Sequence, residues 1–168
     1  FIINHSEAYA IIDENGITSE LTDPQDYDGT FLIIYTSGST GNPKGVVLSK
    51  ESVIENAQAV GKIHGFDKGY KHATCLPLYH CNALCMSLVG TLIYKQPFFL
   101  LEKFTVRGYI DLIEENKITT ASIVPALLEK LVYEKPKLPK CLDYFITAAA
   151  PLSSDLAKRF YDLYGSRL

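Results

Sequence analysis

The stretch FLIIYTSGSTGNPKGVVLS, residues 31–49, places a glycine- and hydroxyl-rich loop between two apolar runs. Residues 31–35 are continuously apolar, which predicts a strand buried on both faces. Residues 45–48 indicate a second strand, so the two strands are expected to form a hairpin around the loop. A simple linker between buried strands would not need this density of glycine and hydroxyl groups.

The chemistry of this loop suits a polyphosphate. Glycines allow backbone N–H groups to converge on one point, and such a cluster of N–H groups binds anions. The loop hydroxyls add donors, and Lys44 adds a positive charge. A Walker A motif is excluded because Pro43 precedes Lys44 and Gly45 follows it. Composition alone leaves an ordinary glycine-rich hairpin turn open as the alternative.

Bulk composition indicates a globular chain that does not bind nucleic acid and has no transmembrane segment. Of its 168 residues 47% are apolar and 21% are charged, and the net charge is −3. This composition excludes a disordered chain and lacks the basic character of nucleic-acid binders. The longest mostly apolar stretch, residues 83–94, is too short for a transmembrane helix.

The four cysteines show no CxxC pair, which predicts reduced thiols and a reducing compartment such as the cytoplasm. Cys81 and Cys85 lie four residues apart beside His80, but this spacing does not predict a metal site. The sequence starts at Phe1 and stops just after a helix-like segment, so we expect a piece of a longer protein.

Strand and helix patterns alternate from residue 46 onward, which predicts an α/β fold with a mostly parallel sheet and flanking helices. Residues 18–30 are expected to form a loop. Besides the hairpin, strands are expected at residues 9–12, 97–104, 118–125 and 142–150, and within residues 72–80, where the strand is expected to end at Pro77 or just after it. Helices are expected at residues 50–65, 82–94, 105–117, 125–135 and 153–165. The predicted helix-start and helix-stop residues are Ser49, Gly65, Thr105, Pro125 and either Ser153 or Ser154.

The loop resembles the signature of the adenylate-forming enzymes, which include acyl- and aryl-CoA synthetases, firefly luciferase and peptide-synthetase adenylation domains. Residues 36–45 match the pattern Ser/Thr-Ser-Gly-Ser/Thr-Thr-Gly-x-Pro-Lys-Gly at every position. The resemblance implies that the loop holds the ATP phosphates. The residues it implicates are Thr36, Ser37, Gly38, Ser39, Thr40, Gly41 and Lys44.

Two further segments resemble this family in the expected order. LPLYHCNAL, residues 76–84, is similar to its Pro-Leu-Phe/Tyr-His motif and implies that Tyr79, His80 and Asn82 line the acid pocket. ITAAAPLSSDL, residues 146–156, is similar to the segment that packs along adenine. That second segment implicates Ala148, Ala149, Ala150 and Pro151. Ala148 stands where the family commonly has glycine, so this loop is expected to be stiffer.

The resemblance implies an acid–CoA ligase that uses ATP, Mg²⁺ and coenzyme A. In the family's reaction a carboxylate attacks the α-phosphorus of ATP, and a thiol then attacks the acyl-adenylate; a role in fatty acid metabolism is one expectation. Residues 1–168 are expected to be part of the large N-terminal AMP-binding domain. The family's Thr-Glu motif and C-terminal lysine would lie outside it, so this piece alone is expected to be inactive.

Several alternatives stay open at this point. The His-containing motif favours CoA ligases, but an adenylation domain that loads a carrier-protein thiol is the nearest alternative. A non-catalytic nucleotide- or acyl-binding module of the same fold is a second, and a P-loop nucleotide hydrolase is a third. Homo-oligomerisation of the full-length protein is also left open.

Overall fold

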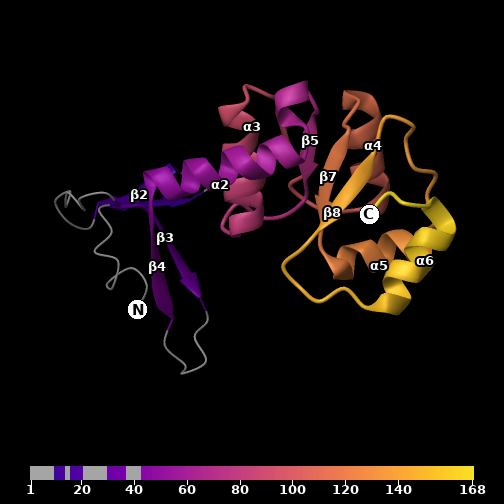
Figure 1. Ribbon diagram of the computed structural model, residues 1–168. Helices are drawn as coiled ribbons and strands as arrows, with labels where there is room; N and C mark the ends of the chain where they lie inside the picture. The colour runs from indigo at the N-terminus through magenta and orange to yellow at the C-terminus, as the bar shows by residue number, and fades with distance from the viewer. Residues whose placement is uncertain (1–9, 14–15, 21–29, 37–42) are drawn as a thin grey trace. The chain divides into compact units, whose positions relative to one another are not determined.

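The computed structural model describes residues 10–13, 16–20, 30–36 and 43–168 of the chain. The chain divides into two compact units, Phe1–Val53 and Ile54–Leu168. Figure 1 shows antiparallel hairpins in the first unit and a sheet flanked by helices in the second. No helix in the described part of the chain is both long enough and apolar enough to cross a membrane.

The first unit contains two antiparallel hairpins. Strand β1 (Ala10–Asp13) pairs with β2 (Gly16–Glu20), with a bulge between Ile11 and Ile12. The strand expected at 9–12 is confirmed, but the prediction of a loop from residue 18 is wrong because β2 continues to Glu20. A short polar strand paired with only one neighbour carries too little apolar pattern to be recognised.

The hairpin around the glycine-rich loop is confirmed. Strand β3 (Thr30–Thr36) pairs antiparallel with β4 (Lys44–Ser49), in a register that sets Tyr35 opposite Gly45. The expected burial of β3 on both faces is wrong, because Phe31 is 55% exposed and Val47 on β4 is 60% exposed. A two-stranded ribbon, unlike a parallel sheet between helices, does not cover both faces of its own strands.

Helix α2 (Lys50–Ile63) begins where the sequence predicted. The Ser49 hydroxyl accepts a hydrogen bond from the Ser52 backbone N–H at 3.1 Å, which caps the helix. Ala57 is fully buried, but Ile63 is 75% exposed, so the expected apolar stripe ends before the helix does. The chain leaves the helix at Gly65, whose φ of 74° suits glycine.

The second unit is built on a four-stranded parallel sheet. Its strands are β5 (His72–Thr74), β6 (Phe98–Leu100), β7 (Thr120–Ile123) and β8 (Tyr144–Thr147). Their order is β6-β5-β7-β8, and every pair is parallel. The predicted α/β class is therefore confirmed, although each strand is shorter than its apolar pattern.

Helices connect these strands and cover the sheet (Figure 1). They are η1 (Phe66–Lys68), η2 (Asn82–Val89), α3 (Gly90–Ile93), α4 (Val106–Asn116), α5 (Pro125–Glu134) and α6 (Ser154–Tyr164). The Thr105 hydroxyl caps α4 by accepting from the Gly108 N–H at 3.0 Å. Ser153, rather than Ser154, caps α6 through the Leu156 N–H at 3.2 Å.

The core of the second unit is a cluster of large side chains between the sheet and its helices. Tyr109, Phe145 and Phe160 are all buried, and their rings follow one another at centroid distances of 6.3 Å and 6.2 Å. The Tyr109 hydroxyl donates to the Ser122 carbonyl at 2.6 Å, so its burial leaves no unsatisfied donor. This packing fixes β7 and β8 against α4 and α6.

A buried histidine lies among hydroxyl groups on the middle strands. His72 on β5 is fully buried, with Nδ1 2.9 Å from the Thr120 hydroxyl and Nε2 3.0 Å from the Ser87 hydroxyl. The Ser122 hydroxyl lies 3.2 Å from Nε2. Burial, with a smaller contribution from His64, lowers the pKa of His72 to about 3. The ring is therefore neutral at physiological pH and links β5, β7 and η2.

Replacing Gly61 by alanine should lower the free energy of unfolding by about 1–3 kcal/mol. A Cβ there would lie 2.6 Å from the Tyr94 ring. That ring cannot easily retreat, because its hydroxyl donates to the Gln58 carbonyl at 2.7 Å. Urea unfolding measures the change, and alanine at the exposed neighbour Lys62 is the control. Equal effects from the two variants would contradict the close packing.

Candidate functional site

Two of the predicted site segments lie at one edge of the parallel sheet. The segment with Tyr79, His80 and Asn82 follows β5, and residues 148–151 follow β8. Because β5, β7 and β8 are parallel neighbours, their carboxyl ends share an edge. Ligands of open α/β sheets bind outside this edge. The fold therefore brings the predicted acid and adenine segments to the place where a ligand is expected.

The acid segment is a turn that presents two aromatic rings. The His80 N–H donates to the Pro77 carbonyl at 3.1 Å, which closes the turn. Tyr79 and His80 are exposed, and their ring centroids are 4.5 Å apart. The expected strand at 72–80 is thus shorter, since β5 ends at Thr74. Pro77 lacks the N–H that a continuing parallel ladder would need.

A π-helix follows directly and was not predicted. The segment expected as a helix at 82–94 consists of η2, in π-helical form, and one turn of α-helix, α3. The Gly90 N–H bonds to the Cys85 carbonyl, five residues back. π-Helical turns are rare and are found most often at functional sites. Periodicity could not distinguish this wider helix, because its residues are almost all apolar.

Two shielded oxygen atoms without partners lie in the two segments. Asn82 Oδ1 and Thr147 Oγ1 are shielded from solvent, and neither has a hydrogen-bond partner among the described residues. Such atoms are costly unless water or a ligand satisfies them. Asn82 was predicted as a pocket residue, whereas Thr147 was missed. Its position at the carboxyl end of β8 was the available signal.

The adenine segment contains one strained residue. Ala149 has φ of 70°, in the left-handed region that non-glycine residues rarely adopt. The sequence drew attention to Ala148, but the left-handed conformation falls one residue later. Ala149, Ala150 and Pro151 are exposed, whereas Ala148 is half-buried. The loop after β8 is therefore held in a conformation that glycine would adopt more easily.

Replacing Ala149 by glycine should raise the free energy of unfolding by about 1 kcal/mol, because it removes the left-handed penalty of a Cβ. The matched variant Ala150→Gly should be slightly destabilising, since Ala150 does not have positive φ. Urea unfolding of both variants measures the difference. If Ala149→Gly lowered the free energy of unfolding as much as Ala150→Gly does, the strained backbone at Ala149 would be contradicted.

The ends of the glycine-rich loop are held opposite each other by the hairpin. Thr36 on β3 pairs with Lys44 on β4, and Lys44 is exposed. A Cβ at Gly45 would approach Ile33 Cγ2 to 3.1 Å, so a larger residue there would require the Ile33 side chain to shift slightly. The remaining predicted phosphate-binding residues, Ser37, Gly38, Ser39, Thr40 and Gly41, lie outside the described residues.

Metal ligands are not gathered in the described part of the chain. Within residues 10–13, 16–20, 30–36 and 43–168, no three His, Cys, Asp or Glu side chains are placed to hold a metal ion. The described residues therefore offer no such cluster for the Mg²⁺ that the resemblance implies.

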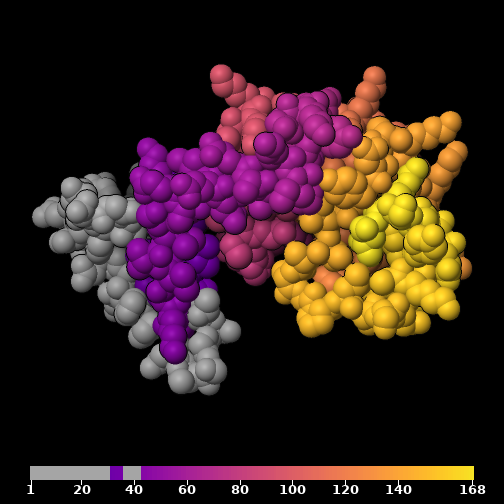
Figure 2. Space-filling view, viewed as in Figure 1, coloured from indigo at the N-terminus to yellow at the C-terminus, as the bar shows by residue number. Residues whose placement is uncertain are grey.

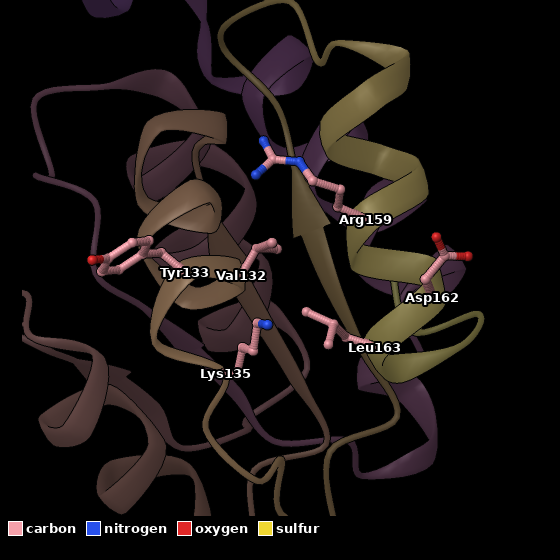
Figure 3. A pocket seen from close by; sticks show the side chains of 6 residues that line it. All are labelled: Val132, Tyr133, Lys135, Arg159, Asp162 and Leu163. Carbon is pink, nitrogen blue, oxygen red and sulfur yellow. The ribbon is translucent and has the colours of Figure 1, made fainter.

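A surface hollow of about 430 Å³ lies between α5 and α6. Figure 3 shows its lining side chains, with Lys135 and Leu163 reaching toward each other from the two sides. These two residues lie at or beyond the C-terminal ends of their helices, away from the sheet edge that bears the site segments. Helix α6 lies on the face of the molecule shown in Figure 2, toward the yellow end of its colour scale. The hollow is therefore separate from the predicted site.

The family of AMP-binding enzymes matches residues 2–168. A 2-succinylbenzoate–CoA ligase of Listeria monocytogenes is 33% identical over 113 residues, which cover 67% of this chain and 24% of that protein. Peroxisomal OPC-8:0-CoA ligase 1 of Arabidopsis thaliana is 28% identical over 145 residues, 83% of this chain and 27% of that protein. The chain thus spans about a quarter of the length of these relatives.

Solved structures show the same fold. The O-succinylbenzoate coenzyme A synthetase of Bacillus subtilis, in complex with ATP and magnesium ion, has a TM-score of 0.73 at 24% identity. The match covers 86% of this chain and 31% of that one. The N-terminal domain of Mycobacterium tuberculosis FACL13 has a TM-score of 0.65 at 29% identity, covering 86% and 38%. From the family match over residues 2–168, we conclude that this chain belongs to the AMP-binding enzymes.

Proposed function

We propose that this chain is part of the N-terminal domain of an acid–CoA ligase and contributes its phosphate loop, acid pocket and adenine wall. In the proposed reaction, a carboxylate oxygen attacks the α-phosphorus of ATP, and pyrophosphate leaves. Coenzyme A thiolate then attacks the acyl-adenylate carbonyl, and AMP leaves. The CoA ligases among its relatives support the reaction type, and their different acids leave the substrate to be identified.

The observation that carries the proposal is the β3–β4 hairpin. It pairs Thr36 with Lys44, so both ends of the ten-residue signature are fixed by strand hydrogen bonds. Because the strands hold the two ends opposite each other, that part of the ordering cost is met before a ligand binds. We propose that Thr40 and Lys44 neutralise charge on the β- and γ-phosphates as pyrophosphate departs.

The acid and adenine ends of the proposed site rest on the carboxyl edge of the sheet. We propose that His80 and Asn82 contact the reacting carboxylate, and that Ala148–Pro151 pack along the adenine. Asn82 Oδ1 and Thr147 Oγ1 would then gain the hydrogen-bond partners that they lack in the described structure. Thr147 is thereby added to the residues that the sequence motifs suggested.

A carrier-protein thiol is the alternative acceptor. Gramicidin S synthase 2 of Brevibacillus brevis is 29% identical over 155 residues, which cover 84% of this chain and 3% of that protein. The His80-containing motif favours coenzyme A. Full-length protein should therefore give acid-dependent exchange of pyrophosphate into ATP, followed by release of a free CoA thioester. Exchange without CoA thioester would favour the carrier-protein alternative, and no exchange across a panel of carboxylic acids would contradict both.

Replacing His80 by alanine in the full-length protein should lower acid-dependent pyrophosphate exchange about 10-fold, the rate equivalent of one hydrogen bond. The free energy of unfolding should hardly change, because the His80 side chain is exposed. Exchange assays at several acid concentrations and urea unfolding measure the two effects. A large loss of stability with unchanged exchange would assign His80 a structural role instead.

A further inference from the structure

The four cysteines fall into two pairs with different surroundings. Cys75 is buried with Sγ 3.6 Å from the Ser122 carbonyl, and Cys141 Sγ is 3.6 Å from the Ile113 carbonyl. Cys81 is exposed and Cys85 is half-buried, and no hydrogen bond to either sulfur is found among the described residues. Cys141 is also half-buried, so Cys81 is the exposed thiol of the four and the one that reagents in solution reach most easily.

Helix geometry places Cys81 and Cys85 on one face. Cys81 is helical (φ −58°, ψ −30°) and immediately precedes η2, and the Leu84 N–H bonds to the His80 carbonyl at 2.9 Å. Residues four apart on a helix have Cβ atoms about 5–6 Å apart. Burial raises the pKa of the Cys85 thiol, and the neighbouring charge on Cys81 raises it further. The four-residue spacing places the two thiols on the same side of the turn.

We propose that Cys81 and Cys85 form a reversible dithiol–disulfide site at the start of η2. A disulfide needs its Cβ atoms about 3.8 Å apart, so the turn must tighten by roughly 1–2 Å. The change falls in the turn that the Leu84 N–H closes on the His80 carbonyl, so this hydrogen bond must adjust with it. Cys75 and Cys141 lie outside the helices and strands, and neither has another cysteine within four residues in the sequence.

The oxidant is a small disulfide such as glutathione disulfide. The exposed Cys81 thiolate attacks one sulfur of the disulfide, and one glutathione thiolate leaves. The Cys85 thiolate then attacks Cys81 Sγ in the mixed disulfide, and the second glutathione thiolate leaves. The two protein thiols lose two electrons and two protons, and one glutathione disulfide becomes two molecules of glutathione.

Closure of the disulfide would change the turn that carries His80 and Asn82. Asn82 lies within the segment that must tighten and His80 immediately precedes it, and both are proposed to contact the acid. If the proposed function is right, oxidation therefore weakens acid activation, and reduction restores it. This consequence rests on the proposed function, whereas formation of the disulfide does not.

The test is a redox titration of the full-length protein in glutathione buffers of stepped potential at pH 8. Each sample is quenched in acid, its free thiols are alkylated under denaturing conditions, and the peptides are analysed by mass spectrometry. Cys81 and Cys85 should become protected together, in one two-electron transition, in a peptide lighter by two hydrogen atoms. Cys75 and Cys141 should remain available for alkylation throughout.

Three variants decide the assignment. Cys85→Ala should accumulate a glutathione mixed disulfide on Cys81, and Cys81→Ser should remove the transition. Cys141→Ser is the matched control and should behave as the wild type. Oxidation of the two cysteines at separate potentials, or mixed disulfides alone in the wild type, would overturn the proposal.

Pyrophosphate exchange provides an independent measurement on the same samples. Exchange should fall at least several-fold on oxidation of the wild type and of Cys141→Ser, and return with dithiothreitol. Each cysteine variant is compared with its own reduced form. If the disulfide forms but pyrophosphate exchange does not fall, the redox site is supported and its proposed effect on acid activation is wrong. Absence of exchange in the reduced wild type would contradict the proposed function, and the mass spectra would still test the disulfide.

Discussion

Replacing Lys44 by alanine in the full-length protein should lower acid-dependent pyrophosphate exchange about 100-fold, equivalent to about 3 kcal/mol of transition-state stabilisation. The physical reason is that charge accumulates on the departing pyrophosphate in the proposed reaction, and an ammonium group at the end of the loop would neutralise it. Lys44 occupies the first position of β4, opposite Thr36, so the strand fixes where its side chain begins. Steady-state exchange at saturating ATP measures the effect on the chemical step.

Lys50→Ala is the matched control for this experiment. Lys50 is an exposed lysine at the first position of α2, near Lys44 in sequence but beyond the hairpin. Its replacement should leave exchange within about twofold, since isolated surface charges contribute little. Thr40→Ala should act in the same direction as Lys44→Ala. Equal exchange by Lys44→Ala and Lys50→Ala would remove the phosphate role from the loop lysine.

Stability of the second unit should fall in acid because of His72. Burial keeps this ring neutral in the folded chain until about pH 3, whereas the unfolded chain protonates it near pH 6.5. Between these values the unfolded state binds more protons, so the His72 contribution is complete above pH 6.5 and is lost as the pH falls. The expected slope from this one group is about 1.4 kcal/mol per pH unit.

A His72→Asn variant separates this effect from the protonation of carboxylates. Asparagine keeps a donor and an acceptor near the Thr120 hydroxyl but does not titrate. The variant is expected to be less stable at pH 7, because the Ser87 contact is lost, yet its stability should decline less steeply between pH 6 and pH 4. Urea unfolding at stepped pH gives both slopes. Identical slopes would mean that His72 is already protonated in the folded chain or never protonates when it unfolds.

The sequence was informative wherever local chemistry decided the structure. Helix caps at Ser49 and Thr105 and the proline at the start of α5 were correctly predicted, since each depends on neighbouring residues alone. The parallel sheet was also correctly predicted, because alternating strand and helix patterns leave few other topologies. The ten-residue signature indicated the family because a long motif of adjacent residues can be recognised from the sequence alone.

Features set by distant partners were not predictable. Phe31 and Val47 have the pattern of buried strand residues, yet the hairpin leaves them exposed. The π-helical form of η2 changes hydrogen-bond partners without changing which residues are apolar. Likewise, the positive φ of Ala149 and the shielded hydroxyl of Thr147 depend on how the loop after β8 meets the sheet. Within the site, residue types were predictable and their environments were not.

The strand order has a consequence for how the second unit assembles during translation. Strand β5 leaves the ribosome first but sits inside the sheet, and both of its neighbours, β6 and β7, are encoded later. The apolar helices η2 and α3 therefore emerge before both neighbours of β5, the strands β6 and β7, have been made; β7 ends at Ile123. Nascent chains that pause in this interval expose apolar surface, and we expect them to be most prone to aggregation there.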